Sequence, residues 1–397
     1  MCGWATLTAF LFLPQLAHPL PDVPLGPLVV HEPRGGPRVI HHPLRGSPLV
    51  ALRLSVPVTE PAGYAGASRT LQELLRDRLE RGAEPLGALA ELSHSPGHAV
   101  YSLVGPVDEL DAMAELLRDA VGPPPLAPGQ VRAAKARVER AGHALSELPD
   151  RRVRADLWSS LFPGAPAGGA NAVPGPLASS HLEWLWRRFY RPSAMSVVVV
   201  GEVPDTVIRS IFADWPTPPE PGPPPSLRPV QGGTAEVQTN AAWVGLGRAA
   251  RTGESGALAA AAELVAARLR AGGIAAAEAE VWWGPGRTAL VVLGSALPDA
   301  PAASPESIRA TIADLAADVT ADLVAEAQRT LRRRLLYQAR TARGLAAVIG
   351  TFHERTGAPD GAARFLDALD RVDAKAVGRI LRALVERPDA VLEIGPQ

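Results

Sequence analysis

The sequence predicts an α+β protein made of two homologous subdomains, each a mostly antiparallel sheet with helices packed on it. Each half of the chain opens with strand-like stretches and continues with helices, and the order repeats, as it would after an internal duplication. Eight prolines lie between Pro216 and Pro229. Such a stretch favours an extended polyproline-II linker, so residues 216–230 are predicted to separate an N-terminal domain, 27–215, from a C-terminal domain, 231–397.

Length, composition and charge place the chain among ordinary globular proteins. With 397 residues, 47% of them hydrophobic and 20% charged, it can bury sizeable cores. Its 40 Lys and Arg residues against 41 Asp and Glu residues leave a net charge of -1, which gives no electrostatic reason to expect nucleic acid or a membrane as a partner. Cys2 is the only cysteine, which excludes an intramolecular disulfide and a cysteine-based zinc site.

The first 26 residues read as an extension rather than as part of the fold. The apolar run Ala9–Leu13 is too short to span a bilayer and is interrupted by Pro14. It has no Lys or Arg ahead of it, unlike a signal peptide. We therefore expect residues 1–26 to be disordered or to come from a mis-assigned start, and we expect a cytoplasmic protein.

Alternation and helical spacing predict the elements of the first half. Leu52, Leu54 and Val56 alternate with polar residues, which is the pattern of a half-buried strand. A Gly-rich turn then leads into a helix from Ser68 to about Arg81, with leucines at helical spacing and Ser68 as the predicted N-cap. The other predicted elements are strands over 28–30, 38–41, 98–103 and 195–200, helices over 108–121, 131–146, 151–161, 181–190 and 204–215, and a short helix or strand over 88–94.

The second half repeats this order. Strand-like stretches come first and last, and helical stretches that are Ala-rich or begin with Pro lie between them. The predicted strands cover 235–246, 279–283, 288–293 and 390–394, and the predicted helices cover 255–270, 304–317, 320–338, 343–356, 361–369 and 373–384.

The polar face of the helix that begins at Ser68 is the stretch most relevant to chemistry. Arg69, Gln72, Glu73 and Arg76 share one stripe at i, i+3, i+4 and i+7. With His, Glu and His at the first three of these positions, the same spacing would bring two ligands and a general base to a metal, as in the His-x-x-Glu-His signature of inverzincins. Here the positions hold Arg, Gln and Glu.

Several further motifs accompany this helix in a specific order. They are the strand 50–56, the lead-in Glu60-Pro61-x-Gly63-Tyr64-Ala65-Gly66, then Leu161-Phe162-Pro163-Gly164, Phe189-Tyr190-Arg191-Pro192-Ser193-Ala194-Met195, and the apolar strand 197–200 with Gly201-Glu202-Val203. In this combination, and from about residue 27 onwards, the chain resembles the insulinase–pitrilysin family of zinc metallopeptidases, which includes mitochondrial processing peptidase and its bacterial relatives. The resemblance implies one half of a clamshell, two α+β subdomains that pair with a partner protein around an enclosed chamber.

The same resemblance implies that the zinc site has been lost. Arg69 stands at the first histidine of the family motif, Gln72 at the catalytic glutamate and Glu73 at the second histidine, and Glu139 is the nearest candidate for the third ligand. A guanidinium cannot ligate Zn²⁺, and an amide cannot take a proton from a metal-bound water. The chain is therefore identified as a degenerate, non-catalytic member with no cofactor of its own, and zinc is expected only in a partner subunit.

Some relatives without the zinc motif contribute an Arg/Tyr pair from the second half, which binds substrate carbonyls in the active partner. Arg270 fits the arginine of that pair, so it is the predicted substrate-binding residue. The tyrosine position holds Ala276 or Ala277, so this sequence departs from the pattern there.

Other histidines and aromatic residues leave alternatives open. His94 and His98 are four residues apart, but Pro96 lies between them, which favours a surface loop over a metal pair. His41 and His42 adjoin in a strand and point to opposite faces, so they cannot chelate one ion together. Glu139 and His143 could form a surface pair or a residual metal pair. The tryptophans at 184, 186, 282 and 283 could be packing anchors or line a peptide chamber.

The polar stripe itself keeps two interpretations, a solvated helix face or a retained contact with substrate or partner. For the whole chain, the sequence favours a non-catalytic subunit of a heterodimeric zinc peptidase that helps enclose a peptide. The alternative is a stand-alone peptide-binding or assembly protein without a peptidase partner. A third hypothesis is an active peptidase with a relocated metal.

Overall fold

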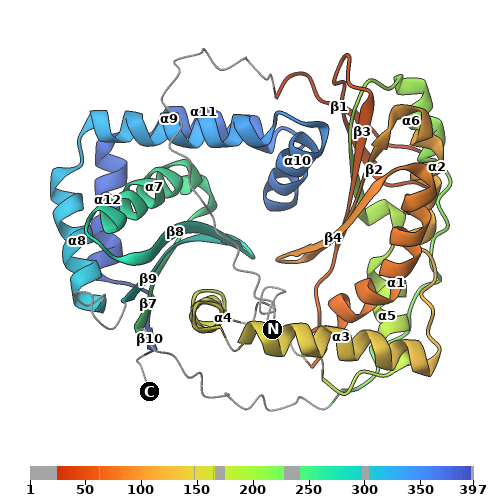
Figure 1. The fold of residues 1–397 in the computed structure, drawn as a ribbon, viewed down its shortest axis with the longest axis horizontal. Helices are drawn as coiled ribbons and strands as arrows, with labels where there is room; N and C mark the ends of the chain where they lie inside the picture. Colours follow the sequence, from red (N-terminus) through yellow and green to blue (C-terminus); the bar gives the residue numbers. More distant parts are fainter. Residues whose placement is uncertain are drawn as a thin grey trace, which may run out of the picture.

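A computed structural model describes residues 25–61, 63–146, 148–163, 165, 175–227, 242–296 and 304–394. It contains a six-stranded sheet from the first half of the chain and a four-stranded sheet from the second half, each covered by helices (Figure 1). The predicted α+β class with two mostly antiparallel sheets is confirmed. None of the described helices combines the length and the hydropathy needed to cross a membrane. Most of the predicted extension, residues 1–24, lies outside the described residues.

The first sheet has the strand order β1-β2-β6-β3-β5-β4, and β4 and β1 are its two edges. All neighbouring strands are antiparallel except β2 and β6, which are parallel. Residues 88–94, predicted as a helix or a strand, lie almost entirely in strand β4. The strands are β1 (Val29–His31), β2 (Arg38–His42), β3 (Leu49–Pro57), β4 (Leu89–Ser95), β5 (His98–Pro106) and β6 (Ser196–Val200).

Helices of the first half cover one face of this sheet. Leu52, Leu54 and Val56 of β3 point into that core, where they meet Leu71 and Leu75. The alternating apolar residues of β3 therefore form part of this core. The other face of β3, with Ala51, packs in a second core. The helices of the first half are α1 (Ala67–Ala83), α2 (Leu110–Ala120), α3 (Pro128–Ser146), α4 (Pro149–Leu161), α5 (Ser179–Phe189) and α6 (Asp205–Ile211).

Helix α6 is shorter than the predicted helix over 204–215. After Ile211 the chain turns away, and Asp214 takes a left-handed conformation with φ of 52°. The amides of Asp214 and Trp215 then donate to the carbonyls of Arg34 and Gly35, at 2.8 and 3.1 Å. These bonds to the turn between β1 and β2 replace the last helical turn, and a local pattern cannot foresee them.

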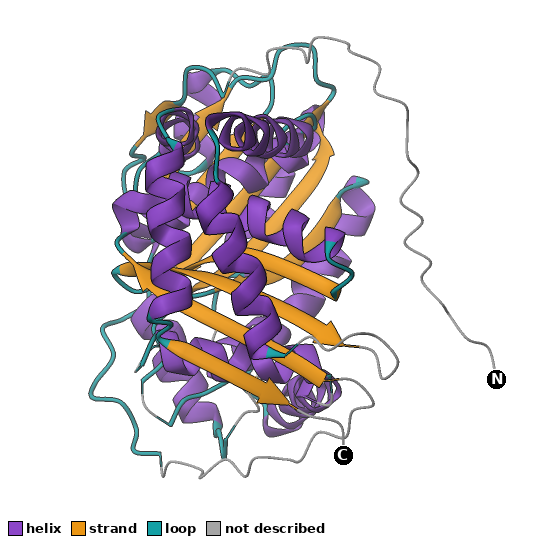
Figure 2. Cartoon of the chain, turned by 90° about the vertical axis from the view of Figure 1, so that its left-hand side faces the viewer, coloured by secondary structure: helices purple, strands orange, loops and turns teal. Residues whose placement is uncertain are grey.

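The second sheet has the order β10-β7-β9-β8 and is antiparallel throughout. Seen from the side of the second half, helices lie over its strands (Figure 2). The part of the predicted strand 235–246 before residue 242 lies outside the described residues. The elements are β7 (Ala242–Ala250), α7 (Ser255–Ala271), β8 (Ala275–Gly284), β9 (Arg287–Ala296), α8 (Pro305–Asp318), α9 (Ala321–Gln338), α10 (Ala342–Thr356), α11 (Gly361–Asp370), α12 (Ala374–Glu386) and β10 (Ala390–Ile394).

Each half lends one helix to the sheet of the other half. Helix α10 packs Leu345 and Ile349 against Ala51 and Val198 on the second face of the first sheet. Helix α4 packs on the second sheet, where its apolar residues join Val291 and others in a separate core. The two halves are therefore interlocked through buried apolar surface rather than joined only by the linker.

Two glycines of β7 allow α4 to approach the second sheet closely. A Cβ on Gly245 would lie 2.6 Å from side-chain carbons of Val153 and Leu157. A Cβ on Gly247 would lie 2.6 Å from Leu161. Real Cβ atoms do not approach other atoms so closely, so any larger residue would push α4 off the sheet.

A buried ion pair joins the exchanged helix α10 to the first sheet. Glu354 has a side chain only 3% exposed, and its Oε1 lies 2.8 Å from Nη2 of Arg53 on β3. Ser55 Oγ donates to the same oxygen, and Ser95 Oγ donates to Oε2 at 2.9 Å. This carboxylate therefore links β3, the end of β4 and α10 at one point.

We predict that Glu354→Gln lowers the free energy of unfolding by about 3–5 kcal/mol, because it leaves the Arg53 guanidinium buried without a counter-charge. The shape of the side chain is nearly kept, so the loss reports charge rather than packing. Urea unfolding measures it. Glu326→Gln is the control, since Glu326 pairs with Arg329 on the exposed face of α9 and its loss should leave the urea midpoint unchanged. Equal midpoints for both variants would contradict the prediction.

Candidate functional site: the motif helix and the cleft between the sheets

Helix α1 is capped by a residue outside the helix, Glu60. Its carboxylate accepts the amides of Gly66 at 3.1 Å and Ser68 at 2.6 Å. The prediction that Ser68 is the N-cap is wrong, because Ser68 lies within the first turn, is buried, and donates its own hydroxyl to Glu60. Burial raises the pKa of Glu60, although the hydrogen bonds from Ser68 and Gly66 act in the opposite direction.

Gln72, at the catalytic-glutamate position of the motif, belongs to the core of the molecule. Its side chain is buried, and Nε2 donates to the carbonyls of Ser93 on β4, at 3.1 Å, and Val100 on β5, at 2.9 Å. The interpretation of a solvated helix face is wrong for this residue. A carboxylate here would face two carbonyl oxygens without a proton to donate, so the site now suits an amide and rejects a general base.

Glu73, at the second-histidine position, is held by two arginines. Arg76 Nη2 lies 2.8 Å from its Oε1, and Arg137 Nε of α3 lies 3.2 Å from its Oε2. Burial alone would raise the pKa of Glu73, but the hydrogen bonds and charges of Arg76 and Arg137 outweigh it and lower the pKa. The carboxylate is thus ionised and saturated by guanidinium groups, which leaves no room for a cationic ligand.

Arg69 and His94 complete the surroundings of the motif. Burial lowers the pKa of Arg69, and the charges of Glu73 and Glu60 partly oppose this. Burial lowers the pKa of His94 on β4 to about 4, and Arg69 acts in the same direction. His94 and His98 do not lie in a loop as predicted; they stand on β4 and β5, on either side of the turn at Pro96 and Gly97. Neutral His94 is a neighbour of the motif that sequence spacing did not reveal, because a separate strand brings it there.

Helix α3 does not bring Glu139 to the motif as a ligand. Glu139 pairs along its own helix with Lys135, at 3.4 Å, and His143 is exposed. The residue of α3 that reaches α1 is Arg137, which also donates to the backbone carbonyl of Glu73. Where a zinc site of this type would need its third ligand, a carboxylate, the structure supplies the cation Arg137.

The residues described by the structure contain one group of three or more potential metal ligands within reach of one another, and it lies elsewhere. His31, His41 and Asp205 meet at β1, the edge of the first sheet opposite to β4. His41 and His42 do not share this group, as their places on opposite strand faces predicted.

A cleft of about 590 Å³ lies between the two sheets. Figure 1 shows the edge strands β4 and β8 facing one another there, with α10 and α4 on either side. The cleft is lined from β4 and the following turn, from α4, from β8 and from α10. Its aromatic lining consists of Trp158, Trp282 and Trp283, so the reading of Trp282 and Trp283 as chamber-lining residues holds for the geometry.

Charged groups of the cleft are arranged on both sides of these tryptophans. Arg154 of α4 bonds both carboxylate oxygens of Glu280 at 3.1 Å, and the indole Nε1 of Trp282 donates to Glu280 at 2.9 Å. Arg355 of α10 lies over the ring of Trp283, 5.4 Å from its centroid. Burial lowers the pKa of Arg355, although the side chain is open to the cavity, because protein surrounds it on the other sides.

Trp184, Trp186 and Arg270 lie outside the cleft lining. Trp186 is buried and donates to the carbonyl of Val121 at 3.0 Å, and Trp184 donates to Gly222 of the linker at 2.7 Å. The predicted substrate-binding residue, Arg270, is exposed in the last turn of α7, where its Nε donates to the carbonyl of Ala266.

Comparisons with known proteins identify the fold. No protein-family model and no curated protein matches the sequence. Among solved structures, a protease from Helicobacter pylori superposes with a TM-score of 0.79 at 13% identity, covering 92% of this chain and 98% of the other. An inactive domain of an M16 peptidase from Pseudomonas fluorescens gives 0.77 at 14%, covering 94% and 98%. A protein assigned as an M16-like peptidase from Alicyclobacillus acidocaldarius gives 0.73 at 16%, covering 94% and 98%.

The chain therefore has the fold of the M16 peptidases, the insulinase–pitrilysin group, as its motifs predicted. One of these neighbours is itself an inactive domain. In this chain, Gln72 of helix α1 is hydrogen-bonded to β4 and β5, and Glu73 lies in an ion-pair network with Arg76 and Arg137.

We predict that Gln72→Glu, which restores the catalytic residue type, destabilises the protein by about 3 kcal/mol at pH 7, because it aims a buried carboxylate at two carbonyl oxygens. Burial and the carbonyls raise the pKa of the new carboxyl in the folded state. The loss of stability is smallest below about pH 4.3, the pKa of an unfolded Glu, where both states are protonated. It grows as the pH rises from there to the raised pKa of the folded state, because the unfolded state releases its proton first.

Urea midpoints measured from pH 4 to 8 check this. Gln72→Met is the matched control, because it also removes both donors but has no group that titrates. A pH-independent difference between the two variants would show that the carboxylate is accommodated at this position.

Proposed function

We propose that this chain is a non-catalytic subunit of an M16-type zinc peptidase, which encloses and grips an extended peptide for a catalytically competent homologous partner. The observation that carries the proposal is the contrast between the two sides of β4. On the α1 side the motif positions are closed by bonds from Gln72 and by the arginine pair on Glu73. On the other side the cleft remains open.

The cleft suits a peptide in both size and surface. Its volume of about 590 Å³ falls in the range of roughly 300–1,000 Å³ typical of ligand pockets. The edge strand β4 has a neighbour on one side only, β5, and its last residue, Ser95, lines the cleft, so a peptide in the cleft could extend along this open edge as an added strand. Main-chain pairing holds a peptide with little regard to sequence, and the tryptophans give apolar contact for its side chains.

Arg355 is the residue that best fits a backbone carbonyl or a terminal carboxylate of that peptide. Its guanidinium rests on Trp283 and Phe352, 5.4 and 5.9 Å from the ring centroids, and faces the cavity. Arg355 would thus have the role predicted for Arg270, although it lies on α10 rather than on α7. We assign the peptide contact to Arg355 because it lines the cleft.

A catalytic partner supplies what this chain lacks. The zinc, its histidine ligands and the general base would come from a His-x-x-Glu-His homologue encoded in the same genome. The cleft of this chain would then complete the chamber in which that homologue cuts.

The alternative function is a stand-alone peptide-binding or assembly protein. It is favoured by one feature: the cleft is lined from both halves of a single chain, so peptide binding does not require a second subunit. The two functions differ in their need for a partner.

We predict that Arg355→Leu weakens binding of extended peptides to the purified protein about tenfold or more, through loss of charge-assisted hydrogen bonds worth roughly 1.5–3 kcal/mol. Fluorescence anisotropy of labelled peptides selected from a random library measures this. Arg329→Leu, on the exposed face of α9, is the control and should bind as the unaltered chain does. Equal affinities of the two variants would remove Arg355 from the binding site.

We predict that co-expression with a His-x-x-Glu-His homologue from the same genome gives a stable complex whose peptidase activity needs both chains. Arg355→Leu should reduce activity of the complex without dissociating it, and a Gln in place of the partner's motif glutamate should abolish activity. If no such homologue co-purifies while this chain still binds peptides, the subunit role is contradicted and the alternative function is supported.

A further inference from the structure

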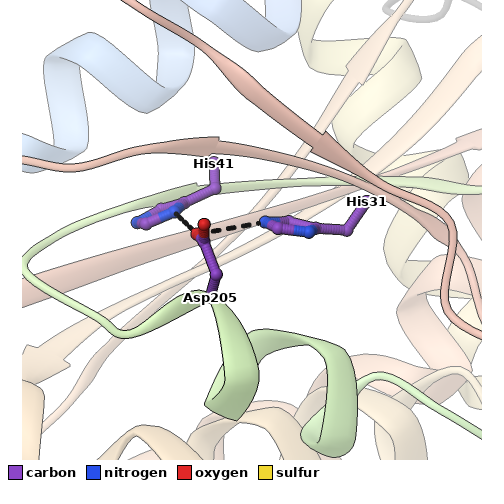
Figure 3. A group of neighbouring side chains, drawn as sticks. All are labelled: His31, His41 and Asp205. Atoms are coloured by element: carbon purple, nitrogen blue, oxygen red, sulfur yellow. Dashed lines mark hydrogen bonds and ion pairs between the residues drawn. The ribbon is translucent and has the colours of Figure 1, made fainter.

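Three metal-ligating side chains converge at the edge of the first sheet opposite to the cleft (Figure 3). His31 of β1, His41 of β2 and Asp205, the first residue of α6, point at one another from three separate elements. Asp205 Oδ1 lies 3.3 Å from Nε2 of His31 and 3.2 Å from Nδ1 of His41. Both imidazoles are buried, with side chains 1% and 2% exposed, whereas the Asp205 side chain is 51% exposed and opens a path from solvent.

The hydrogen bond of His41 to Gly201 leaves its other ring nitrogen, Nδ1, as the candidate ligand atom. Its Nε2 lies 3.2 Å from the carbonyl oxygen of Gly201, which only accepts, so Nε2 carries a proton. In a neutral imidazole Nδ1 is then an unprotonated acceptor, and it points at a carboxylate oxygen. Nδ1 of His41 and Oδ1 of Asp205 lie 3.2 Å apart and are therefore placed to share one cation.

His31 adds an unsatisfied ligand atom at the same point. Its Nε2 is buried and has no hydrogen-bond partner of acceptable geometry, despite the ion-pair distance to Asp205. Its other nitrogen, Nδ1, lies 3.3 Å from Nε of Arg209, an exposed residue one helical turn beyond Asp205. Nε2 of His31 is therefore the second candidate ligand atom at this point, once the ring proton lies on Nδ1.

The two distances from Asp205 Oδ1 to the imidazole nitrogens, 3.3 and 3.2 Å, also fit an ion. A tetrahedral Zn²⁺ with bonds of about 2.0–2.1 Å keeps its ligand atoms roughly 3.3 Å apart. Metal-binding histidines commonly donate their second ring nitrogen to a backbone carbonyl, as His41 does to Gly201. Two imidazoles and one carboxylate are a ligand set for a divalent transition metal, with a fourth position left for water on the side of Asp205.

We propose that His31, His41 and Asp205 form a binding site for a divalent transition metal of the Zn²⁺ type, which clamps the edge strand β1 and helix α6 to β2. The site is independent of the peptide cleft and of the lost zinc motif. Arg209 opposes metal binding. It donates to His31 Nδ1, and it must swing away before that nitrogen can carry the proton that a neutral, metal-bound imidazole needs.

The test uses Zn²⁺ alone. The full-length protein is stripped with a chelator, dialysed and titrated with Zn²⁺ by calorimetry, and bound metal is counted by mass spectrometry. We expect one Zn²⁺ per chain and a rise in melting temperature with Zn²⁺ concentration, because a ligand that binds only the folded state stabilises it. Co²⁺ in place of Zn²⁺ should give the visible absorption of a site of low coordination number.

Three variants make the result specific. Asp205→Asn, at a half-exposed position that should not disturb folding, should weaken Zn²⁺ binding about 100-fold, and Arg209→Gln should strengthen it about tenfold, by analogy with the 10–100-fold effects of residues around metal ligands. His143→Ala removes an exposed histidine and should change nothing. The proposal is overturned if Asp205→Asn binds as much Zn²⁺ as the unaltered chain with equal affinity. It is also overturned if the unaltered chain binds none at about 100 µM, a concentration that corresponds to a binding free energy of roughly -5.5 kcal/mol.

Discussion

The arrangement of this protein depends on the exchange of α4 and α10 between its two halves. A sheet with apolar residues on both faces must be covered on both, and here each half supplies the cover for one face of the other half's sheet. The exchange constrains the position of the two sheets relative to one another, because α4 packs closely on Gly245 and Gly247 of the second sheet. It also brings β4 and β8 opposite one another, and so creates the cleft. The ion pair of Glu354 with Arg53 lies at the same seam and joins the wall of the cleft to the centre of the first sheet.

The polar stripe of helix α1 has a structural role. In a metallopeptidase the polar stripe of this helix would stay free to bind metal and move a proton. Here the amide nitrogen of Gln72 donates hydrogen bonds to carbonyls of β4 and β5, and Glu73 is paired with arginines from two helices. The helix therefore keeps its position in the fold and uses its polar atoms to hold neighbouring elements together.

The two edges of the first sheet have different chemistry. At β4, backbone groups and tryptophans face a cavity between the halves, which suits an extended chain. At β1, two buried imidazoles and a carboxylate meet at a point, which suits a small cation. Strand β1 has only three residues and a single neighbour, so little backbone pairing holds it in place. A bond from His31 to a shared ion would add what that short pairing lacks.

Much of this protein was determined by its sequence. Alternating and helical periodicities predicted the strands and helices within a few residues, since both patterns arise from local burial. The order of short motifs predicted the fold. Only the tertiary structure decided the rest. It showed that Glu60 caps α1, that Arg137 rather than Glu139 faces the motif, that Arg355 lines the cleft, and that His31, His41 and Asp205 meet. Each of these contacts joins residues that are distant in the chain or lie on separate elements, and their geometry depends on how sheets and helices pack, which no local pattern encodes.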